Sequence, residues 1–325
     1  MPPADSPSVV VVVVAYNRRE LLLEVLDALE AQTLAPTRVV VVDNASDDGS
    51  ASAAATHPSG VDLVSLARNT GGAGGFAAGA AHALQATDAE WVWFMDDDTV
   101  PTPDALAELI AAVHDDERIV IAGSRVVWTD GSDHPMNTPR RKPFVRRSEN
   151  RSAHEHGVLP VRSSSFVSML ARSSAIRERG LPAADYFIWN DDFEFSTRLL
   201  RGRRGVFVPS SVVVHKTAKL GATDIDPGPR FYYEVRNKLW MLRFSRGLNP
   251  AEKAVYGASS VLRWARTALR SHDRATLRDG FRRGWRHGWQ TAPRDNTRAL
   301  ADLGPASQEV AEFEAGRPGR AGADA

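Results

Sequence analysis

Apolar and polar positions alternate in blocks along the first third of the chain. The segment 8–16 is a continuous β-branched run, which predicts a strand buried on both faces, and further apolar segments predict strands at 37–46, 61–69 and 90–95. Between these runs, apolar residues recur at helical spacing, which predicts helices over 17–32, 70–84 and 102–113. This alternation of strands and helices predicts an α/β doubly wound layout over roughly the first 125 residues.

The pattern changes after this block. Further strands are predicted at 119–128, 165–176 and 206–216, and the segment 129–163 is polar, basic and long enough to be a functional loop. A turn followed by a helix is predicted over 185–205. We therefore expect four regions: an N-terminal tail at 1–7, an α/β domain at 8–220, a basic helical region at 221–302 and a flexible tail at 303–325.

Composition narrows the class of protein only a little. The chain has 40 Lys plus Arg and 40 Asp plus Glu, so its net charge does not indicate a nucleic-acid partner. It has no cysteine, which excludes disulfides, thiolate metal sites and a cysteine nucleophile. The first residues lack the basic segment of a signal peptide, and each apolar run is far shorter than a bilayer span. We expect a protein that is soluble or lies on a membrane surface.

Three adjacent carboxylates, Asp96 to Asp98, follow the fourth apolar run. Because ligands bind at the carboxyl ends of the strands in such sheets, these residues should share an edge with Asp43 and Asn69. Oxygen ligands in this arrangement favour Mg²⁺ or Mn²⁺, and the cation would remove their mutual repulsion. The alternative is that they cap the next helix, which accounts for one Asp but not for three.

Five motifs in sequence carry a family resemblance. They are "AYN", "VVDNASDDGS", "RNTGGAGGFAAG", "FMDDDT" and "WNDDFEFSTRLLRGRRGVFVPSSVVVHK". Together they resemble family 2 inverting glycosyltransferases with the GT-A fold, over about 8–220. Their particular forms look most like actinobacterial galactofuranosyltransferases, with rhamnosyltransferases next. The resemblance implies a metal-dependent hexosyltransferase that uses UDP-galactofuranose, or alternatively dTDP-rhamnose.

The resemblance also implies a set of donor-binding residues. They are Ala15, Tyr16, Asn17, Asp43, Arg68, Asn69, Gly72, Asp96 and Asp97. Asp43 would contact the uridine, although a strand-end Asp bonded to its own turn is the structural alternative. Tyr16 would pack on the base or simply against its neighbours, and Arg68 would reach uracil or phosphate unless it is a surface residue.

The segment "NDDFE" (190–194) is expected to carry the chemistry. An inverting transfer needs a general base for the acceptor hydroxyl, and either Asp191 or Asp192 fills that role in the family's variants. Trp189 and Glu194 would bind the acceptor, by stacking and by hydrogen bonding. The alternative is an acidic helix N-terminus stabilised by the helix dipole, with Trp189 in the core.

Metal ligands follow from the same resemblance. Asp96, Asp98 and His215 would hold Mn²⁺ or Mg²⁺, because His215 ends the last strand of the block at the position of the family's third ligand. A lone histidine is otherwise more often structural.

The C-terminal third is basic. Residues 251–300 hold 11 Lys or Arg against 4 Asp or Glu, with Trp264, Trp285 and Trp289 among them. This composition favours contact with an anionic membrane or with the diphosphate of a lipid-linked acceptor, and the alternative is plain packing against the catalytic domain.

The partners and location follow from the basic region and the family. We expect a polyprenyl-diphosphate glycan acceptor of the cell envelope, no nucleic acid, and a cytoplasmic protein peripheral to the inner face of the membrane, with homo-oligomerisation left open. Two rival functions are a nucleotidyltransferase, whose glycine-rich signature the first strand lacks, and a non-catalytic sugar-nucleotide or glycan-binding module.

Overall fold

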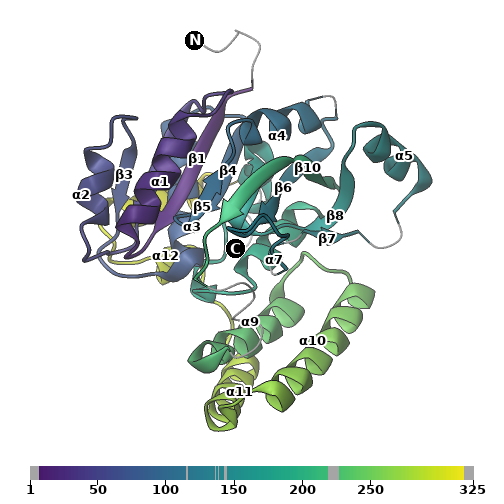
Figure 1. The fold of residues 1–325 in the computed structure, drawn as a ribbon. Helices are drawn as coiled ribbons and strands as arrows, with labels where there is room; N and C mark the ends of the chain where they lie inside the picture. The colour runs from purple at the N-terminus through teal and green to yellow at the C-terminus, as the bar shows by residue number, and fades with distance from the viewer. Residues whose placement is uncertain are drawn as a thin grey trace.

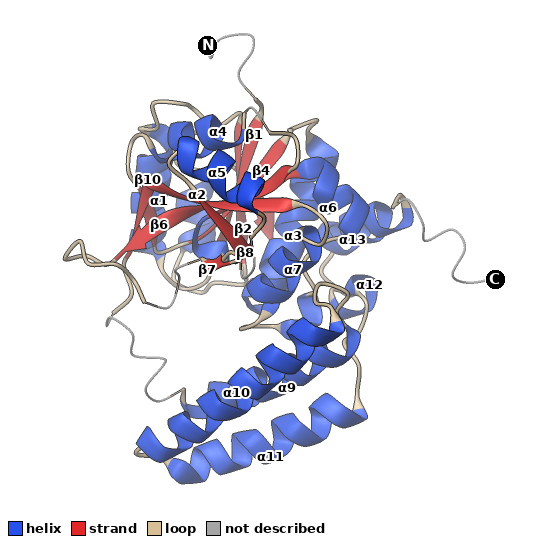
Figure 2. Ribbon diagram, turned by 90° about the vertical axis from the view of Figure 1, so that its right-hand side faces the viewer, coloured by secondary structure: helices blue, strands red, loops and turns tan. Residues whose placement is uncertain are grey.

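The fold is a single mixed sheet with helices on both faces and a separate helical layer (Figures 1 and 2). The computed structural model describes residues 7–114, 116–135, 137, 139–142, 145–218 and 227–317. The strands within these residues are β1 (Val9–Ala15), β2 (Arg38–Asp43), β3 (Asp62–Ser65), β4 (Trp91–Asp96), β5 (Thr99–Pro101), β6 (Ile119–Val127), β7 (Arg140–Arg141), β8 (Leu159–Ser163), β9 (Met169–Arg172) and β10 (Arg204–His215). Their order is β3-β2-β1-β4-β9-β6-β10-β8-β7, and β5 pairs with β10.

Helices connect and cover the strands. Those described are α1 (Arg19–Glu30), α2 (Ser50–Ala55), α3 (Gly71–Ala86), α4 (Ala105–Val113), α5 (Arg147–Glu155), α6 (Ser173–Arg179), α7 (Asp191–Leu199), α9 (Phe231–Phe244), α10 (Pro250–Arg270), α11 (Arg274–Gln290), α12 (Asn296–Ala299) and α13 (Pro305–Ala315). The predicted α/β class with a helical C-terminal region is therefore confirmed.

The register of β1 decides where the polar strand ends meet. β1 runs parallel to β2 and β4, with Ala15 opposite Asp43 and Val14 opposite Asp96. Every side chain of β1 is buried, as its unbroken apolar run predicts for a strand covered on both faces. The parallel pairing thus places the last residues of three strands at one edge of the sheet.

The glycines of α3 allow this helix to lie directly on the sheet. A Cβ added at Gly75 would meet Val14 at 2.5 Å, and one added at Gly79 would meet Val12 at the same distance. The small residues of α3 therefore bring its first turn close to the carboxyl edge of β1.

The two segments expected to be irregular contain regular structure. The segment 129–163 includes the helix α5 and the strands β7 and β8, and the two strands extend the sheet beyond β10. The flexible tail expected from 303 is wrong for residues 303–317. There α13 packs on α3 through buried Val310 and Phe313, because its apolar residues keep helical spacing.

The helical region forms a layer beside the sheet (Figure 1). Within it, α11 lies against α9 through three buried glycines, Gly280, Gly284 and Gly288. Of the tryptophans expected at a membrane surface, Trp264 is buried and packs edge-on against Phe281, so that expectation is wrong for this residue. In the described part of the chain, no helix combines the length and the apolar character needed to cross a membrane.

Candidate active site

A cleft of 1460 Å³ lies at the carboxyl edge of the parallel strands. One wall comes from the strand ends and the first turn of α3, and the other comes from the segment before α7, from α9 and from α10. Of the residues expected from the sequence, the following line it: Tyr16, Asn17, Asn69, Gly72, Asp96, Asp97, Asp98, Trp189, Asp191, Asp192 and His215. Ala15 and Asp43 are buried directly beside this wall, at the ends of β1 and β2.

The predicted metal ligands lie together. Oxygen atoms of Asp96 and Asp98 and a ring nitrogen of His215 lie within 4.8 Å of one another. The antiparallel pairing of β10 with β5 brings His215 to the two carboxylates, because it sets His215 opposite Thr99, the residue after Asp98. His215 Nε2 is 3.1 Å from Asp98 Oδ1, while Nδ1 is 3.0 Å from Asn137 Oδ1. Asn137 thereby fixes the ring orientation and leaves Nε2 directed at the carboxylates.

The three carboxyl groups differ in their protonation. Burial, together with the charge of Asp98, raises the pKa of Asp96 to about 7, and burial raises the pKa of Asp97 to about 6. Burial acts in the same direction on Asp98, but a hydrogen bond and the charge of His215 outweigh it and hold the pKa of Asp98 below its usual value. Two carboxylates and an imidazole are suitable ligands for Mn²⁺ or Mg²⁺. The positive charge of such a cation would stabilise the ionised form of Asp96, which burial and the charge of Asp98 disfavour.

Arg18 is part of this cluster, although the sequence analysis did not identify it. Its Nη1 donates to Asp97 Oδ1 at 3.0 Å and to Asp98 Oδ2 at 2.6 Å. The backbone N–H of Tyr16 also donates to Asp97, at 2.9 Å. Hydrogen bonds from Arg18 and from the Tyr16 backbone therefore fix the Asp97 carboxylate at the cleft wall. Asp96 and His215 line the same cleft.

The edge of the cleft at the end of β2 is built around two adjacent residues, Asp43 and Asn44. Asp43 Oδ2 accepts a hydrogen bond from the Ser46 N–H at 3.2 Å, but its buried Oδ1 has no partner among the described residues. Asn44, which sequence reasoning missed, accepts from the Thr70 N–H at 2.8 Å and donates to the Gly71 carbonyl at 3.0 Å. Asn44 thus ties the strand end to the glycine turn, and Asp43 keeps one acceptor available.

Two expected site residues lie elsewhere. Arg68 donates to the Ala299 carbonyl at 2.8 Å and does not line the cleft, because the C-terminal segment lies against the end of β3. Glu194 is buried, pairs with Arg198 at 3.0 Å and accepts from Ser245 Oγ at 2.8 Å. Both side chains hold elements together, so the expected roles in donor and acceptor binding are corrected.

The segment that leads into α7 has an unusual backbone. Phe187, Trp189 and Asn190 have φ values of 67°, 66° and 63°, a region that residues with a side chain seldom adopt. Each such residue costs of the order of 1 kcal/mol or more, and such strain is concentrated at functional sites. Phe187 lies against Gly71, where a Cβ would overlap its carbonyl group. This strained segment presents Trp189 and Asp191 to the cleft.

A buried asparagine of α9 holds this segment in place. The side-chain amide of Asn237 donates to the carbonyls of Tyr186, Ile188 and Trp189 at 2.8–2.9 Å. The neighbouring Arg236 donates to the Asp185 carbonyl at 2.8 Å. These contacts show that the helical region supports the geometry of the cleft.

The two acids at the start of α7 have different surroundings. Burial, followed by the charge of Asp192, raises the pKa of Asp191 well above its usual range, and the charge of Asp96 acts in the same direction. Burial also raises the pKa of Asp192, but a hydrogen bond from the Phe193 N–H and the charges of Arg140 and Lys238 oppose it. Both acids therefore hold a proton to a higher pH than an ordinary carboxyl group does.

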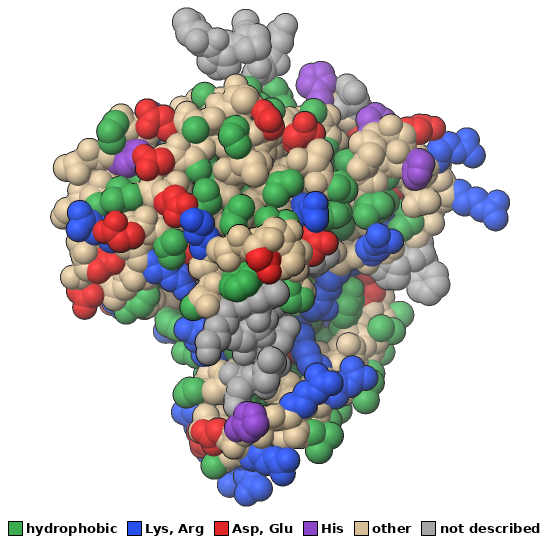
Figure 3. All heavy atoms as spheres, viewed as in Figure 1, with side chains coloured by type: hydrophobic (Ala, Val, Ile, Leu, Met, Phe, Trp, Pro, Cys, Tyr) green, Lys and Arg blue, Asp and Glu red, His purple; other side chains and the backbone are tan. Residues whose placement is uncertain are grey.

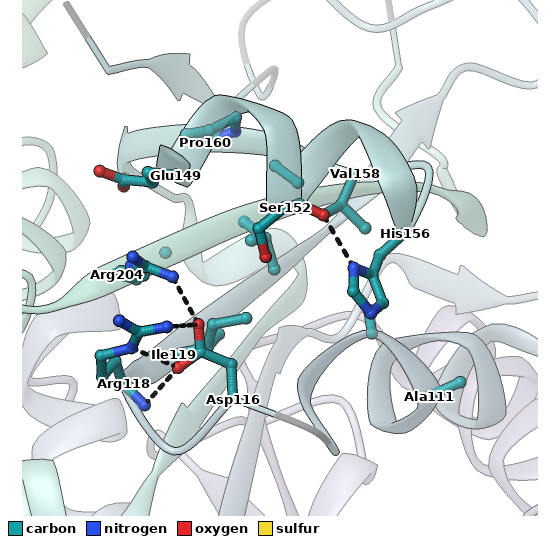
Figure 4. A pocket seen from close by; sticks show the side chains of 14 residues that line it. Ala111, Asp116, Arg118, Ile119, Glu149, Ser152, His156, Val158, Pro160 and Arg204 are labelled. Carbon is teal, nitrogen blue, oxygen red and sulfur yellow. Dashed lines mark hydrogen bonds and ion pairs between the residues drawn. The ribbon is translucent and has the colours of Figure 1, made fainter. Parts of the chain in front are cut away.

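A second, smaller pocket of 120 Å³ lies between α4, α5 and the amino ends of β6 and β10 (Figure 4). Its charged groups are paired: Asp116 accepts from Arg118 and Arg204 at 2.7–3.0 Å, which holds its pKa at about 2 despite burial. Since it lies at the opposite end of the strands and its acid is neutralised, we assign it a structural role.

Comparison with known proteins agrees with this arrangement. The galactofuranosyltransferase GlfT1 of Mycobacterium tuberculosis H37Rv is 36% identical over 201 residues, which are 60% of this chain and 65% of that protein. GlfT1 of Mycolicibacterium smegmatis is 34% identical over 197 residues, 58% and 64% of the two chains. The chain therefore spans less than two thirds of the length of these relatives.

Solved structures share the fold. Residues 1–349 of Staphylococcus aureus TarS superpose with a TM-score of 0.57 at 16% identity, covering 90% of this chain and 81% of that one. GalNAc-T7, crystallised with UDP, GalNAc and Mn²⁺, gives 0.54 at 15% identity, covering 79% and 55%. Residues 10–174 match the family described as "Glycosyl transferase family 2". The family resemblance predicted from the motifs is thus confirmed, and the chain belongs to glycosyl transferase family 2.

Proposed function

We propose that the protein is an inverting glycosyltransferase that moves a hexosyl group from a nucleotide-diphosphate sugar to an acceptor hydroxyl. The observation that carries this proposal is one cleft that holds both a cluster able to hold a metal ion, Asp96, Asp98 and His215, and a separate buried acid, Asp191. Asp96 and Asp191 both line this cleft, so one bound donor and one acceptor can reach the two groups together.

The favoured donor is UDP-galactofuranose. Two features support it: the GlfT1 relatives are named galactofuranosyltransferases, and the free buried oxygen of Asp43 is an acceptor for an N–H or hydroxyl of uridine. Tyr16, which is half-exposed at the same edge, would cover the base. The alternative donor is dTDP-rhamnose, whose thymine offers the same N–H.

Asp96, Asp98 and His215 would hold Mn²⁺ or Mg²⁺, as their ligand chemistry fits, and the structurally similar GalNAc-T7 was crystallised with Mn²⁺. When bound, the cation supplies positive charge next to the donor diphosphate. Arg18, whose guanidinium lies on Asp97 and Asp98, adds a second positive group there.

In the transfer, the acceptor oxygen forms a bond to the anomeric carbon while the bond from that carbon to the diphosphate oxygen breaks. Asp191 takes the acceptor proton, and the nucleoside diphosphate leaves on the opposite face. Trp189, fixed by the strained segment, lies beside Asp191 where it can stack on a sugar ring. Asp192 orients the base or the acceptor.

The acceptor that we favour is a lipid-linked, cell-envelope glycan. Four arginines line the cleft on the side of the helical region: Arg230, Arg263, Arg266 and Arg270. Figure 3 shows Lys and Arg side chains gathered between the sheet domain and the helices below it. A polyprenyl diphosphate would be neutralised by such a group, in a protein peripheral to an anionic membrane.

The test is release of nucleoside diphosphate from a panel of nucleotide sugars in the presence of Mn²⁺, with wild-type protein and the Asp98→Asn variant. UDP-galactofuranose should be the best substrate, and the variant should be inactive. A rival, non-catalytic binding module would bind one sugar nucleotide and hydrolyse none. A preference for dTDP-rhamnose would replace the favoured donor by the alternative one.

A further inference from the structure

We propose that α10 is a membrane-docking helix whose exposed apolar face enters the surface of an anionic bilayer. Among its 21 residues, all of them described, Ser260 and Trp264 are the buried ones. A helix that packs so little of itself against its own protein leaves most of its surface to solvent or to a partner.

The exposed residues of α10 form a continuous apolar face. They recur at intervals of one, three and four positions, which gathers them on one side of a helix. They are Ala251, Ala254, Val255, Ala258, Val261, Leu262, Ala265, Ala268 and Leu269. Val255, Leu262 and Leu269 are 68%, 59% and 74% exposed, so large side chains of this face are mostly uncovered. An apolar face of this length marks an interaction surface.

Charge indicates which partner covers the face. Residues 250–290 carry nine Lys or Arg against three Asp or Glu, in a chain whose total charge is zero. Two copies of α10 would bring these positive regions together and repel each other. An anionic lipid surface attracts them, and the combination of an apolar face with flanking arginines is the pattern of an interfacial helix.

The position of α10 connects this surface to the cleft. Arg266 and Arg270, one helical turn apart, lie next to the apolar face and line the cleft. The N-terminus of α10 is fixed to the sheet domain, because Arg162 of β8 donates to Glu252 in the first turn at 2.7 Å. If the proposed function holds, α10 lets the diphosphate of a lipid-linked acceptor enter the cleft at the membrane surface.

Vesicle flotation of the full chain, without any sugar donor, tests the proposal. The vesicles contain equal parts of phosphatidylcholine and phosphatidylglycerol. The combined variant Val255→Ser, Leu262→Ser, Leu269→Ser should bind at least about tenfold more weakly, since three aliphatic side chains no longer enter the bilayer. The matched control Val255→Leu, Leu262→Met, Leu269→Met keeps the apolar face and should bind like the wild type.

Two further measurements complete the test. Wild-type binding should fall about tenfold on vesicles of phosphatidylcholine alone, which requires no variant to fold. Donor hydrolysis by the serine variant in solution should equal that of the wild type, so failure of the proposed activity would leave the binding result readable. Equal flotation of all variants, or none by the wild type, overturns the proposal. A wild-type dimer that the serine variant converts to a monomer would instead identify a second copy as the occupant.

Discussion

The side-chain amide of Asn237 donates to the backbone carbonyl of Trp189 at 2.9 Å, across 48 residues of chain. The same amide group reaches the carbonyls of Tyr186 and Ile188, and Asn237 is fully buried. Asn237 lies in α9, outside the residues that match the family, yet it holds the strained segment that presents Asp191. The helical region is therefore part of the active-site scaffold.

Asn237→Ala should slow transfer at least about tenfold while leaving donor affinity unchanged, because Trp189 and Asp191 lose their fixed orientation. Stability should fall by about 3 kcal/mol, since buried carbonyls lose their donors. Asn296→Ala is the control: Asn296 is similarly buried and holds Ala184 and Pro182. It should reduce stability but not kcat. Equal kcat for both variants would contradict a positioning role of Asn237.

The carboxyl edge of the sheet could be predicted from sequence because parallel strands bring their ends together. Asp43, Asp96 and Asp98 each follow an apolar run; the register places Asp43 and Asp96 at one edge of the sheet, and Asp98 lies beside Asp96. Position along the chain was sufficient for these residues, since one topological rule places all of them.

Residues that act through distant partners could not be predicted in this way. Arg68 lies at the correct strand end, but its guanidinium binds a carbonyl 231 residues away. Asn237 gives no local signal, because its partners are backbone groups of another element. Glu194 was expected to bind the acceptor, but it pairs with Arg198 one helical turn along α7 and accepts from Ser245 of a distant segment.

Metal removal should abolish activity. Excess EDTA should stop transfer, and Asp98→Asn should weaken Mn²⁺ binding at least about tenfold, because it removes one charged ligand. Mn²⁺ binding can be followed by electron paramagnetic resonance without any activity assay. The control is Asp116→Asn, which alters a partly exposed ion pair in the small pocket and should leave the Mn²⁺ affinity unchanged. Full transfer in excess EDTA would contradict the proposed metal site.

Lys238 should make stability depend on pH in the alkaline range. Burial lowers its pKa to about 8, against an ordinary value of 10.5, although the charge of Glu234 opposes this. As the pH rises from 8 to 10.5, the folded state releases this proton before the unfolded state does. The contribution of Lys238 to stability therefore increases over this window and is lost again as the pH falls through 8.

Urea unfolding of wild type and Lys238→Met at pH 8 and at pH 10 measures this effect. The free energy of unfolding of the wild type minus that of the variant should be larger at pH 10 than at pH 8. The effects of all other titrating groups cancel in this difference, because both proteins contain them. A constant difference between the two proteins would show that Lys238 keeps its proton throughout.

Replacement of the base should separate chemistry from binding. Asp191→Asn keeps the size of the side chain but removes the proton acceptor, so transfer should fall by about 10²–10⁴-fold. Asp192→Asn should cause a smaller loss, since Asp192 is held by the Phe193 N–H and faces the charges of Arg140 and Lys238. UDP-sugar affinity should hardly change in either variant, because the proposed donor contacts lie at the other end of the cleft. Burial raises the pKa of Asp191, so wild-type transfer should decline on acidification at a higher pH than an ordinary carboxylate would cause. Loss of donor binding in both variants would make the pair a structural element, and unchanged transfer in both would place the base elsewhere.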